Sequence, residues 1–246
     1  MLSLNEIMLN STVSRVVERI NMDNKIKGIL FDFNGTMIFD TDIHRAVWHK
    51  FMPSLTGKPI NDAEIDKYII GRGNTYIFTS YIPGISTELV EKYTYEKEAA
   101  YRAECLCEPD KFKLVDGLVE LLDALKQKGI PMTIATGSEI NNITFYFEQF
   151  GLERWFDFDK VVYDDCTFPG KPDPEVYIRA AAKLGLTPAD CIIFEDSYSG
   201  VKAARAAGAG LVLAVSEKNS DADYIEAGGV DAAAHDFVGY KTLLML

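Results

Sequence analysis

Four short polar segments could carry chemistry, and each follows an apolar run that is typical of a buried strand. Asp32, Thr136 and Asp196 each come at the end of such a run, and Lys171 lies in the loop after another. In open parallel sheets, ligands bind at the carboxyl edge of the strands. We therefore expect these four residues to share one site.

Two of the segments suit attack on a phosphoryl group. A carboxylate at the end of a buried strand, such as Asp32, can act as a nucleophile toward phosphorus. Gly35, three residues later, allows the backbone to turn tightly beside that group. Lys171 lies between Gly170 and Pro172 in a stiff turn, and its ammonium group could neutralise developing charge.

The other two segments suit phosphate oxygens and a divalent cation. A hydroxyl and free amides at the strand-to-helix turn formed by Thr136, Gly137 and Ser138 could hold phosphate, aided by the helix dipole. Glu195 and Asp196 are adjacent carboxylates, and Mg²⁺ prefers such hard oxygen ligands. The sequence thus predicts a magnesium site.

Strand-like and helix-like patterns alternate along most of the chain. This alternation predicts an α/β fold with a parallel sheet covered by helices on both faces. The expected strands are 28–31, 131–135, 161–162, 191–194 and 211–215, and the expected helices are 116–125, 139–149, 174–184 and 201–207.

A polar, helix-rich stretch interrupts the alternation after the first strand. We interpret residues 39–112 as an inserted helical cap, and residues 26–38 with 113–246 as the core. Closure of the cap would need hinges near 37–40 and 109–116. Apolar residues at roughly helical spacing predict a separate helix within 1–25.

Composition narrows the class of partner. The 246 residues carry a net charge of −12, from 25 basic and 37 acidic side chains, which argues against a nucleic-acid partner and an anionic membrane surface. A small phosphorylated metabolite remains compatible if a cation cancels its charge locally. The four cysteines form no CxxC pair, and no apolar run reaches the length of a membrane span or resembles a signal peptide. We expect a reduced, cytoplasmic protein, and the sequence leaves its oligomeric state open.

The segments DFNGT (32–36), ATGS (135–138), GKPDP (170–174) and FEDSYSGVKAARAAG (194–208), taken in this order, resemble the haloacid dehalogenase superfamily, and most closely its β-phosphoglucomutase-like branch. The resemblance implies a Rossmann-like core, Mg²⁺ and a phosphoaspartate intermediate. The resemblance also implies that Asp32 is the nucleophile, that Thr136 and Gly137 form the phosphate-binding turn, and that Lys171 neutralises charge. It implies four metal ligands, which are Asp32, the main-chain carbonyl of Asn34, Glu195 and Asp196.

The chain departs from this family at Asn34, where relatives usually have a second Asp that exchanges a proton with the leaving oxygen. A carboxamide cannot do this near neutral pH. Asp40, Asp42 or His44 could supply the proton, and His44 matches a histidine of the relatives. The substrate could instead have an acidic leaving group, such as an acyl phosphate. The protein could also bind a phosphorylated ligand with little turnover, or Asn34 could be an introduced substitution.

A second departure lies in the expected cap. In the mutases of this branch an arginine grips the distal phosphate of the sugar, but here Asn74 aligns with it and Arg72 is displaced by two residues. Bidentate arginine geometry does not tolerate such a shift easily. The sequence therefore favours a Mg²⁺-dependent phosphatase over a mutase. His44 and Arg72 are further candidates for contact with the substrate.

Overall fold

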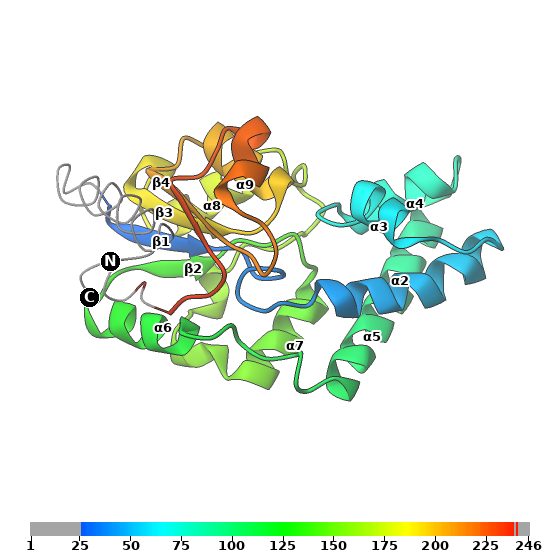
Figure 1. Cartoon of the computed structure of the whole chain (residues 1–246), viewed down its shortest axis with the longest axis horizontal. Coiled ribbons are helices and arrows are strands. Elements are labelled where there is room, and N and C mark those ends of the chain that lie inside the picture. Colours follow the sequence, from blue (N-terminus) through cyan, green and yellow to red (C-terminus); the bar gives the residue numbers. More distant parts are fainter. Residues whose placement is uncertain (1–25, 239, 241–246) are drawn as a thin grey trace, which may run out of the picture.

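The computed structural model describes residues 26–238 and residue 240. Five parallel strands form one sheet in the order β2–β1–β3–β4–β5 (Figure 1). They are β1 (Gly28–Phe31), β2 (Met132–Ile134), β3 (Cys191–Glu195), β4 (Leu211–Val215) and β5 (Ala232–Ala234). The prediction of an α/β fold with a Rossmann-like parallel sheet is confirmed.

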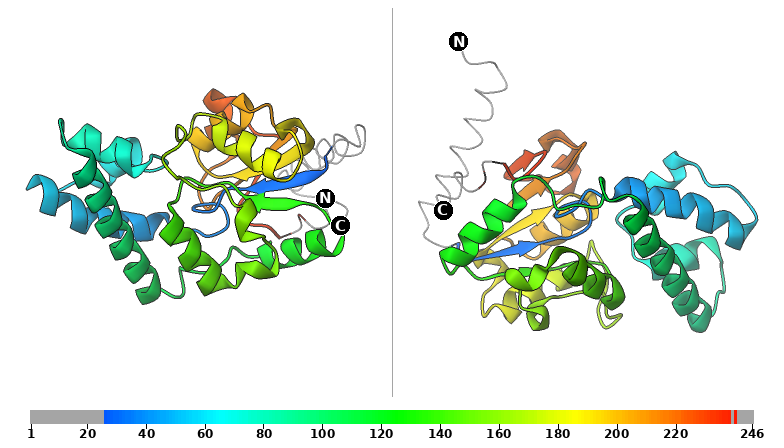
Figure 2. Two further views of the ribbon diagram at one scale, coloured as in Figure 1. Left: turned by 180° about the vertical axis from the view of Figure 1, so that it is seen from behind. Right: turned by 90° about the horizontal axis from the view of Figure 1, so that it is seen from below.

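Side chains alternate between the two faces of the sheet, and each face is covered by a pair of helices (Figures 1 and 2). Phe31 and Phe194 pack in the apolar core that includes α6 (Leu118–Gln127) and α7 (Ile140–Phe150). On the opposite face, Ile193 packs with α8 (Glu175–Lys183) and α9 (Tyr198–Ala206). Because both faces are buried, the strands are apolar apart from Thr133 in β2 and Glu195 at the end of β3.

The register of the sheet brings the predicted site residues to one edge. Phe31, the last residue of β1, is paired with Ile134 at the end of β2 and with Phe194 near the end of β3. The chain therefore leaves all three strands at the same edge, and the polar residues that follow them become neighbours.

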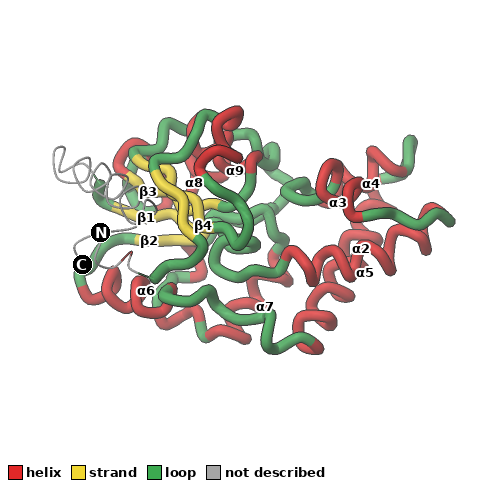
Figure 3. Tube along the Cα trace, in the orientation of Figure 1, coloured by secondary structure: helices red, strands yellow, loops and turns green. Residues whose placement is uncertain are grey.

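Four helices lie beside this edge, and the segment that they form, residues 41–107, contains no strand (Figures 1 and 3). We call them the cap helices: α2 (Thr41–Thr56), α3 (Asp62–Tyr68), α4 (Asn74–Tyr81) and α5 (Thr87–Cys107). A separate apolar cluster, built around Trp48, Ile65 and Phe78, holds them together. The two linkers that join them to the sheet lie side by side, because Ile38 pairs with Leu114.

Three details differ from the sequence analysis or lie beyond it. Residues 161–162 form only a single bridge, between Ala135 and Val162, and not a strand. Strand β5 was not predicted, because a run of alanines has weak β-propensity. The helix expected within 1–25 lies outside the described residues. None of the helices described in residues 26–240 has the length and apolar character that crossing a bilayer would require.

Candidate active site

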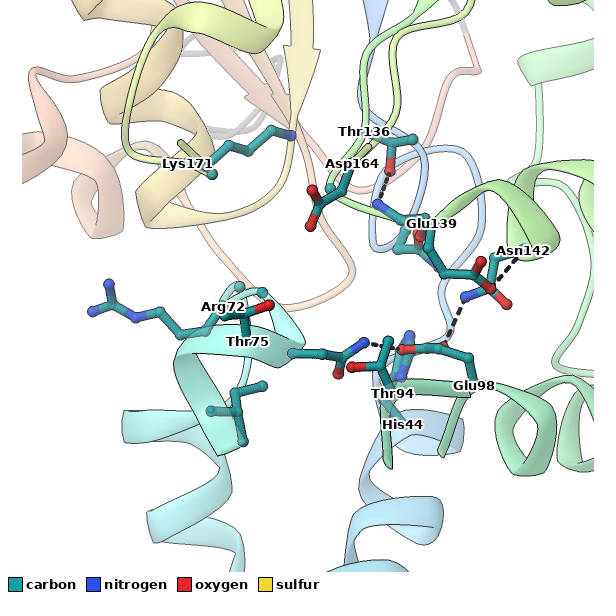
Figure 4. A pocket seen from close by; sticks show the side chains of 18 of the residues that line it. His44, Arg72, Thr75, Thr94, Glu98, Thr136, Glu139, Asn142, Asp164 and Lys171 are labelled. Carbon is teal, nitrogen blue, oxygen red and sulfur yellow. Dashed lines mark hydrogen bonds between the residues drawn. The ribbon is translucent and has the colours of Figure 1, made fainter. Parts of the chain in front are cut away.

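A cavity of about 390 Å³ lies where the carboxyl edge of the sheet meets the cap helices (Figure 4). Both parts of the chain contribute to its lining. All of the residues predicted for the site line it except Glu195, which lies buried directly beneath: Asp32, Asn34, Gly35, His44, Arg72, Thr136, Gly137, Ser138, Lys171 and Asp196.

At the sheet edge, Lys171 bridges two buried carboxylates. Its Nζ atom lies 2.6 Å from Asp32 Oδ1 and 2.5 Å from Glu195 Oε1. Tyr177, on α8, donates to the same oxygen of Glu195 at 2.7 Å, and the backbone amides of residues 196 and 197 donate to the other oxygen. Glu195 thus fixes the position of Lys171, and Lys171 in turn faces Asp32.

Burial and neighbouring charges shift the pKa values of the three carboxyl groups at the sheet edge in different directions. Burial raises the pKa of Asp32 to about 7, although Lys171 opposes the shift. Burial also raises the pKa of Glu195, but contact with Lys171 outweighs it and the net pKa is lowered. Burial and the neighbouring carboxylates Glu195 and Asp32 raise the pKa of Asp196 well above its usual value. The site therefore concentrates more negative charge than Lys171 alone compensates.

The donor atoms fit a hard divalent cation. Asp32, Glu195 and Asp196 each offer a carboxylate oxygen, and these oxygens lie within 4.8 Å of one another. Asp196 also lies close to the backbone of the first loop, because a Cβ atom on Gly35 would be 2.2 Å from Asp196 Oδ2. Carboxylate oxygens crowded in this way are the ligands that Mg²⁺ prefers.

The turn after β2 approaches the same place. The backbone amide of Ser138 donates to Thr136 Oγ1 at 3.1 Å, which holds the turn. Glu139 caps α7 by accepting the backbone amides of Asn141 and Asn142. The turn therefore presents Thr136, Gly137 and Ser138 to the cavity beside Asp32.

Asn34 is fixed by four polar side chains, which with it we call the Asn34 cluster. Its Nδ2 atom donates to Asp40 Oδ2 at 2.6 Å and to the Tyr146 hydroxyl at 2.8 Å, and lies 3.3 Å from the Tyr101 hydroxyl. Its Oδ1 atom accepts from Ser138 Oγ at 2.6 Å. The amide orientation follows from these partners. Asn34 is therefore held firmly, with its nitrogen toward a carboxylate.

The residues predicted as substitute proton donors are engaged. Asp40 is 1% exposed and accepts from the Gly35 amide, from Tyr101 and from Asn34. Burial raises its pKa, but His44 and these hydrogen bonds outweigh burial, so the net pKa is lowered and Asp40 stays ionised. Asp42 lies at the surface in an ion pair with an arginine.

The imidazole of His44 has a partner on each nitrogen. Nε2 lies 3.2 Å from Asp40 Oδ2, and Nδ1 lies 3.2 Å from the ammonium nitrogen of Lys97. The ring also stacks on Tyr101 with centroids 4.0 Å apart. Since Lys97 can only donate, the neutral ring carries its proton on Nε2.

Sequence reasoning missed several polar residues of the cavity wall. Lys97 and Glu98, on α5, form a buried ion pair at 2.7 Å, and Asn74 and Asn142 donate to Glu98. Tyr101, one turn further on, belongs to the Asn34 cluster. A charged pair inside a helical stretch resembles any solvated helix face, so the sequence carries no signal for this site.

Arg72 takes a different direction from the other predicted site residues. Its side chain points away from the cavity in Figure 4, and its guanidinium lies 5.2 Å from the ring of Tyr76. Asn74, which aligns with the arginine of the mutases, faces the cavity and donates to Glu98. A role for Arg72 in binding the substrate stays a prediction.

The chain is similar to known phosphatases over most of its length. It is 27% identical over 210 residues to the phosphorylated carbohydrates phosphatase of Thermotoga maritima, which covers 83% of this chain and 93% of that protein. It is also 27% identical over 209 residues to the fructose-1-phosphate phosphatase YqaB of Escherichia coli, which covers 76% of this chain and 95% of that protein.

Solved structures share the fold. A haloacid dehalogenase (HAD) hydrolase, family IA, variant 3, from Entamoeba histolytica superposes with a TM-score of 0.78 at 34% identity, over 90% of this chain and all of the other. A β-phosphoglucomutase from Clostridium difficile superposes with a TM-score of 0.71 at 20% identity, over 89% of this chain and 96% of the other. At that identity the second likeness concerns the fold alone.

The family model of the haloacid dehalogenase-like hydrolases matches residues 26–208, which include all four polar segments. The expectation of a hydrolytic enzyme is thereby confirmed. This chain belongs to the haloacid dehalogenase-like hydrolases.

Proposed function

We propose that the protein is a Mg²⁺-dependent phosphatase that acts on small phosphorylated carbohydrates through an aspartyl-phosphate on Asp32. The observation that carries this proposal is the buried carboxylate of Asp32, held by Lys171 beside Asp196 in a cavity at the sheet edge. Two relatives that match most of the chain are phosphatases of phosphorylated carbohydrates and of fructose 1-phosphate, respectively.

Each residue at the sheet edge has a part in this scheme. Asp32 attacks phosphorus in line with the leaving oxygen and becomes the acyl phosphate. Lys171 neutralises charge on the phosphoryl oxygens, and the turn at Thr136 and Gly137 holds those oxygens in place. Water then hydrolyses the acyl phosphate and restores the carboxylate of Asp32. The cap helices cover the cavity and limit bulk water.

The metal ligands are proposed from the donor set. Asp32, Asp196 and the backbone carbonyl of Asn34 would hold Mg²⁺, which when bound supplies positive charge to the phosphoryl group. Glu195 belongs to the same cluster of three carboxylate side chains, but its two oxygens already accept hydrogen bonds from Lys171 and from the backbone of the following turn. We therefore assign Glu195 first to the positioning of Lys171, and its metal contact remains a prediction.

Asn34 supports a second candidate, a phospho-ligand-binding protein with weak turnover. Its carboxamide cannot transfer a proton, and Asp40 and His44 beside it are committed to other partners. On this reading the protein binds phosphorylated carbohydrates but releases phosphate slowly from esters whose leaving group must be protonated. The mutase alternative has less support, since Arg72 points away from the cavity.

Phosphate release decides between these candidates. The purified chain is assayed against sugar phosphates and p-nitrophenyl phosphate, with Mg²⁺ and with a chelator, and Asp32→Asn serves as the control for contaminating phosphatase. We expect Mg²⁺-dependent release that Asp32→Asn abolishes, and a mass gain of about one phosphoryl group on Asp32 in rapidly quenched samples.

Other results would change the assignment. Saturable sugar-phosphate binding without phosphate release would favour the binding protein. Interconversion of sugar phosphates without release, in a coupled assay, would favour the mutase.

We also propose a reducing, cytoplasmic setting, because Cys105 and Cys191 are buried free thiols.

A further inference from the structure

The end of the cavity that faces the cap helices offers hydrogen bonds without a free cation. We call it the cap end. Its residues come from the cap helices, from the turn before α7, from α7 itself and from the loop after residue 162, and Figure 4 labels all of them except Asn74. They are Asn74, Thr75, Thr94, Glu98, Glu139, Asn142 and Asp164.

Positive side chains near the cap end are already paired. Lys97 is 3% exposed and donates to Glu98 at 2.7 Å, with His44 at 3.2 Å as its other neighbour. Arg102 donates to Glu139 at 3.0 Å and to an amide oxygen on α7 at 2.7 Å. In the part of the chain that the structure describes, these cations balance carboxylates and leave no charge for a ligand.

The other lysine and arginine residues that line the cavity, Arg72 and Lys171, are no better placed to meet a ligand at the cap end. Arg72 is exposed and directed away from the cavity (Figure 4). Lys171 lies at the opposite end, committed to Asp32 and Glu195. Among the described residues, a second phosphate on the substrate would therefore meet at the cap end only lysine and arginine side chains that already pair with carboxylates, although phosphate sites in proteins normally supply a free one.

One carboxylate at the cap end is contacted by a single residue and by no cation. Asp164 Oδ1 accepts the backbone amide of Cys166 at 3.0 Å, and the Cys166 thiol is its second hydrogen-bond partner; no other residue that the structure describes between 26 and 240 donates to this carboxylate. The Asp164 side chain points into the cavity in Figure 4. Its backbone amide donates to the carbonyl of Ser138 at 2.9 Å, so Asp164 is tied to the phosphate-binding turn.

We propose that Asp164 is a specificity-determining residue that selects polyhydroxylated monophosphates and rejects bisphosphates. Its carboxylate accepts a hydrogen bond from a hydroxyl group of the substrate, and the same negative charge repels a second phosphate. Like charges placed together are unfavourable, whereas a carboxylate that accepts from a hydroxyl is stabilising. This inference rests on the proposed function and names the substrate class for that site.

The test compares two esters that differ only at the distal end, fructose 6-phosphate and fructose 1,6-bisphosphate. The value of kcat/KM is measured for each with the native chain, Asp164→Asn and Asp165→Asn. Asp165 is the matched control, because it is an exposed carboxylate one residue away that accepts from Thr167 and does not line the cavity.

We expect the native chain and Asp165→Asn to prefer the monophosphate to the same extent. Asp164→Asn should reduce that preference about tenfold, which corresponds to about 1.4 kcal/mol. If Asp164→Asn and Asp165→Asn discriminate equally, or if the native chain prefers the bisphosphate, the inference is overturned while phosphate release leaves the proposed function standing.

A binding measurement covers the case in which no ester is hydrolysed. The two sugars are titrated calorimetrically, with Mg²⁺, into Asp32→Asn and into Asp32→Asn/Asp164→Asn. Tighter binding of the monophosphate that weakens in the double variant supports the role of Asp164 even if the phosphatase assignment fails. Equal affinities for the two sugars, or no binding of either, overturn it.

Discussion

Replacing the carboxamide of Asn34 by a carboxyl group tests the reasoning about proton transfer most directly. Asn34 Nδ2 lies 2.6 Å from Asp40 Oδ2, so Asn34→Asp places two carboxyl oxygens at about that separation. At an effective dielectric constant of about 20, two unit charges this close repel by about 6 kcal/mol. The pair therefore retains one proton near neutral pH, and that proton is available to a leaving oxygen.

The expected gain is large for substrates with poor leaving groups. General acid catalysis contributes roughly 10²–10⁴-fold, so kcat/KM of Asn34→Asp for fructose 6-phosphate should rise at least 100-fold. Phosphates of graded leaving-group pKa provide the assay. The slope of log kcat/KM against that pKa should be steep for the native chain and shallow for Asn34→Asp.

The exchange variant Asn34→Asp/Asp40→Asn distinguishes the effect of a proton shared between two carboxyl groups from the effect of a single carboxyl group at position 34. It keeps one carboxyl and one carboxamide in contact but removes the repulsion, so the carboxyl at position 34 ionises at lower pH. Its loss of activity with rising pH should therefore begin at least one pH unit lower than that of Asn34→Asp. If Asn34→Asp stays within threefold of the native rate while Asp32→Asn is inactive, proton donation at position 34 does not limit the reaction.

Three other perturbations follow from packing and burial. A Cβ atom on Gly200 would lie 1.6 Å from Glu195 Oε1, so Gly200→Ala should cost about 1–3 kcal/mol in urea denaturation and reduce phosphate release; unchanged values would contradict the geometry. Burial raises the pKa of Glu98, but Lys97, His44 and the hydrogen bond from Asn74 together outweigh burial and lower it from 4.5 to about 2. The ionised form therefore contributes on the order of 3 kcal/mol above pH 4.5, which is lost as the pH falls toward 2. The deficit of Glu98→Gln in urea denaturation should shrink between pH 7 and pH 3, and an equal deficit at both would refute the assignment. Burial raises the pKa of Cys105 to about 12, so peptide mapping after iodoacetamide at pH 8 should find this thiol unmodified unless the chain unfolds.

The Asn34 cluster shows where sequence reasoning ends. Asn34 and Asp40 are six residues apart, and the chain between them gives no sign that they touch. Their contact depends on the turn after β1, and the hydroxyls of Tyr101 and Tyr146 arrive from α5 and α7. Such contacts are set by helix packing over long separations in sequence, so no local pattern predicts them.

Features decided by short-range periodicity and strand ends could be predicted from the amino-acid sequence alone. An apolar run that stops at a polar residue places Asp32, Thr136 and Asp196 at strand ends, and the parallel arrangement brings strand ends together. The sheet, its covering helices and the gathering of these polar residues at its edge follow from that rule. Only the tertiary structure decides which carboxylates are neutralised, because Glu98 pairs with Lys97 whereas Asp164, which faces the cavity, pairs with no cation among the described residues. The reason is that charge pairing depends on distances of a few ångströms between elements that the sequence leaves far apart.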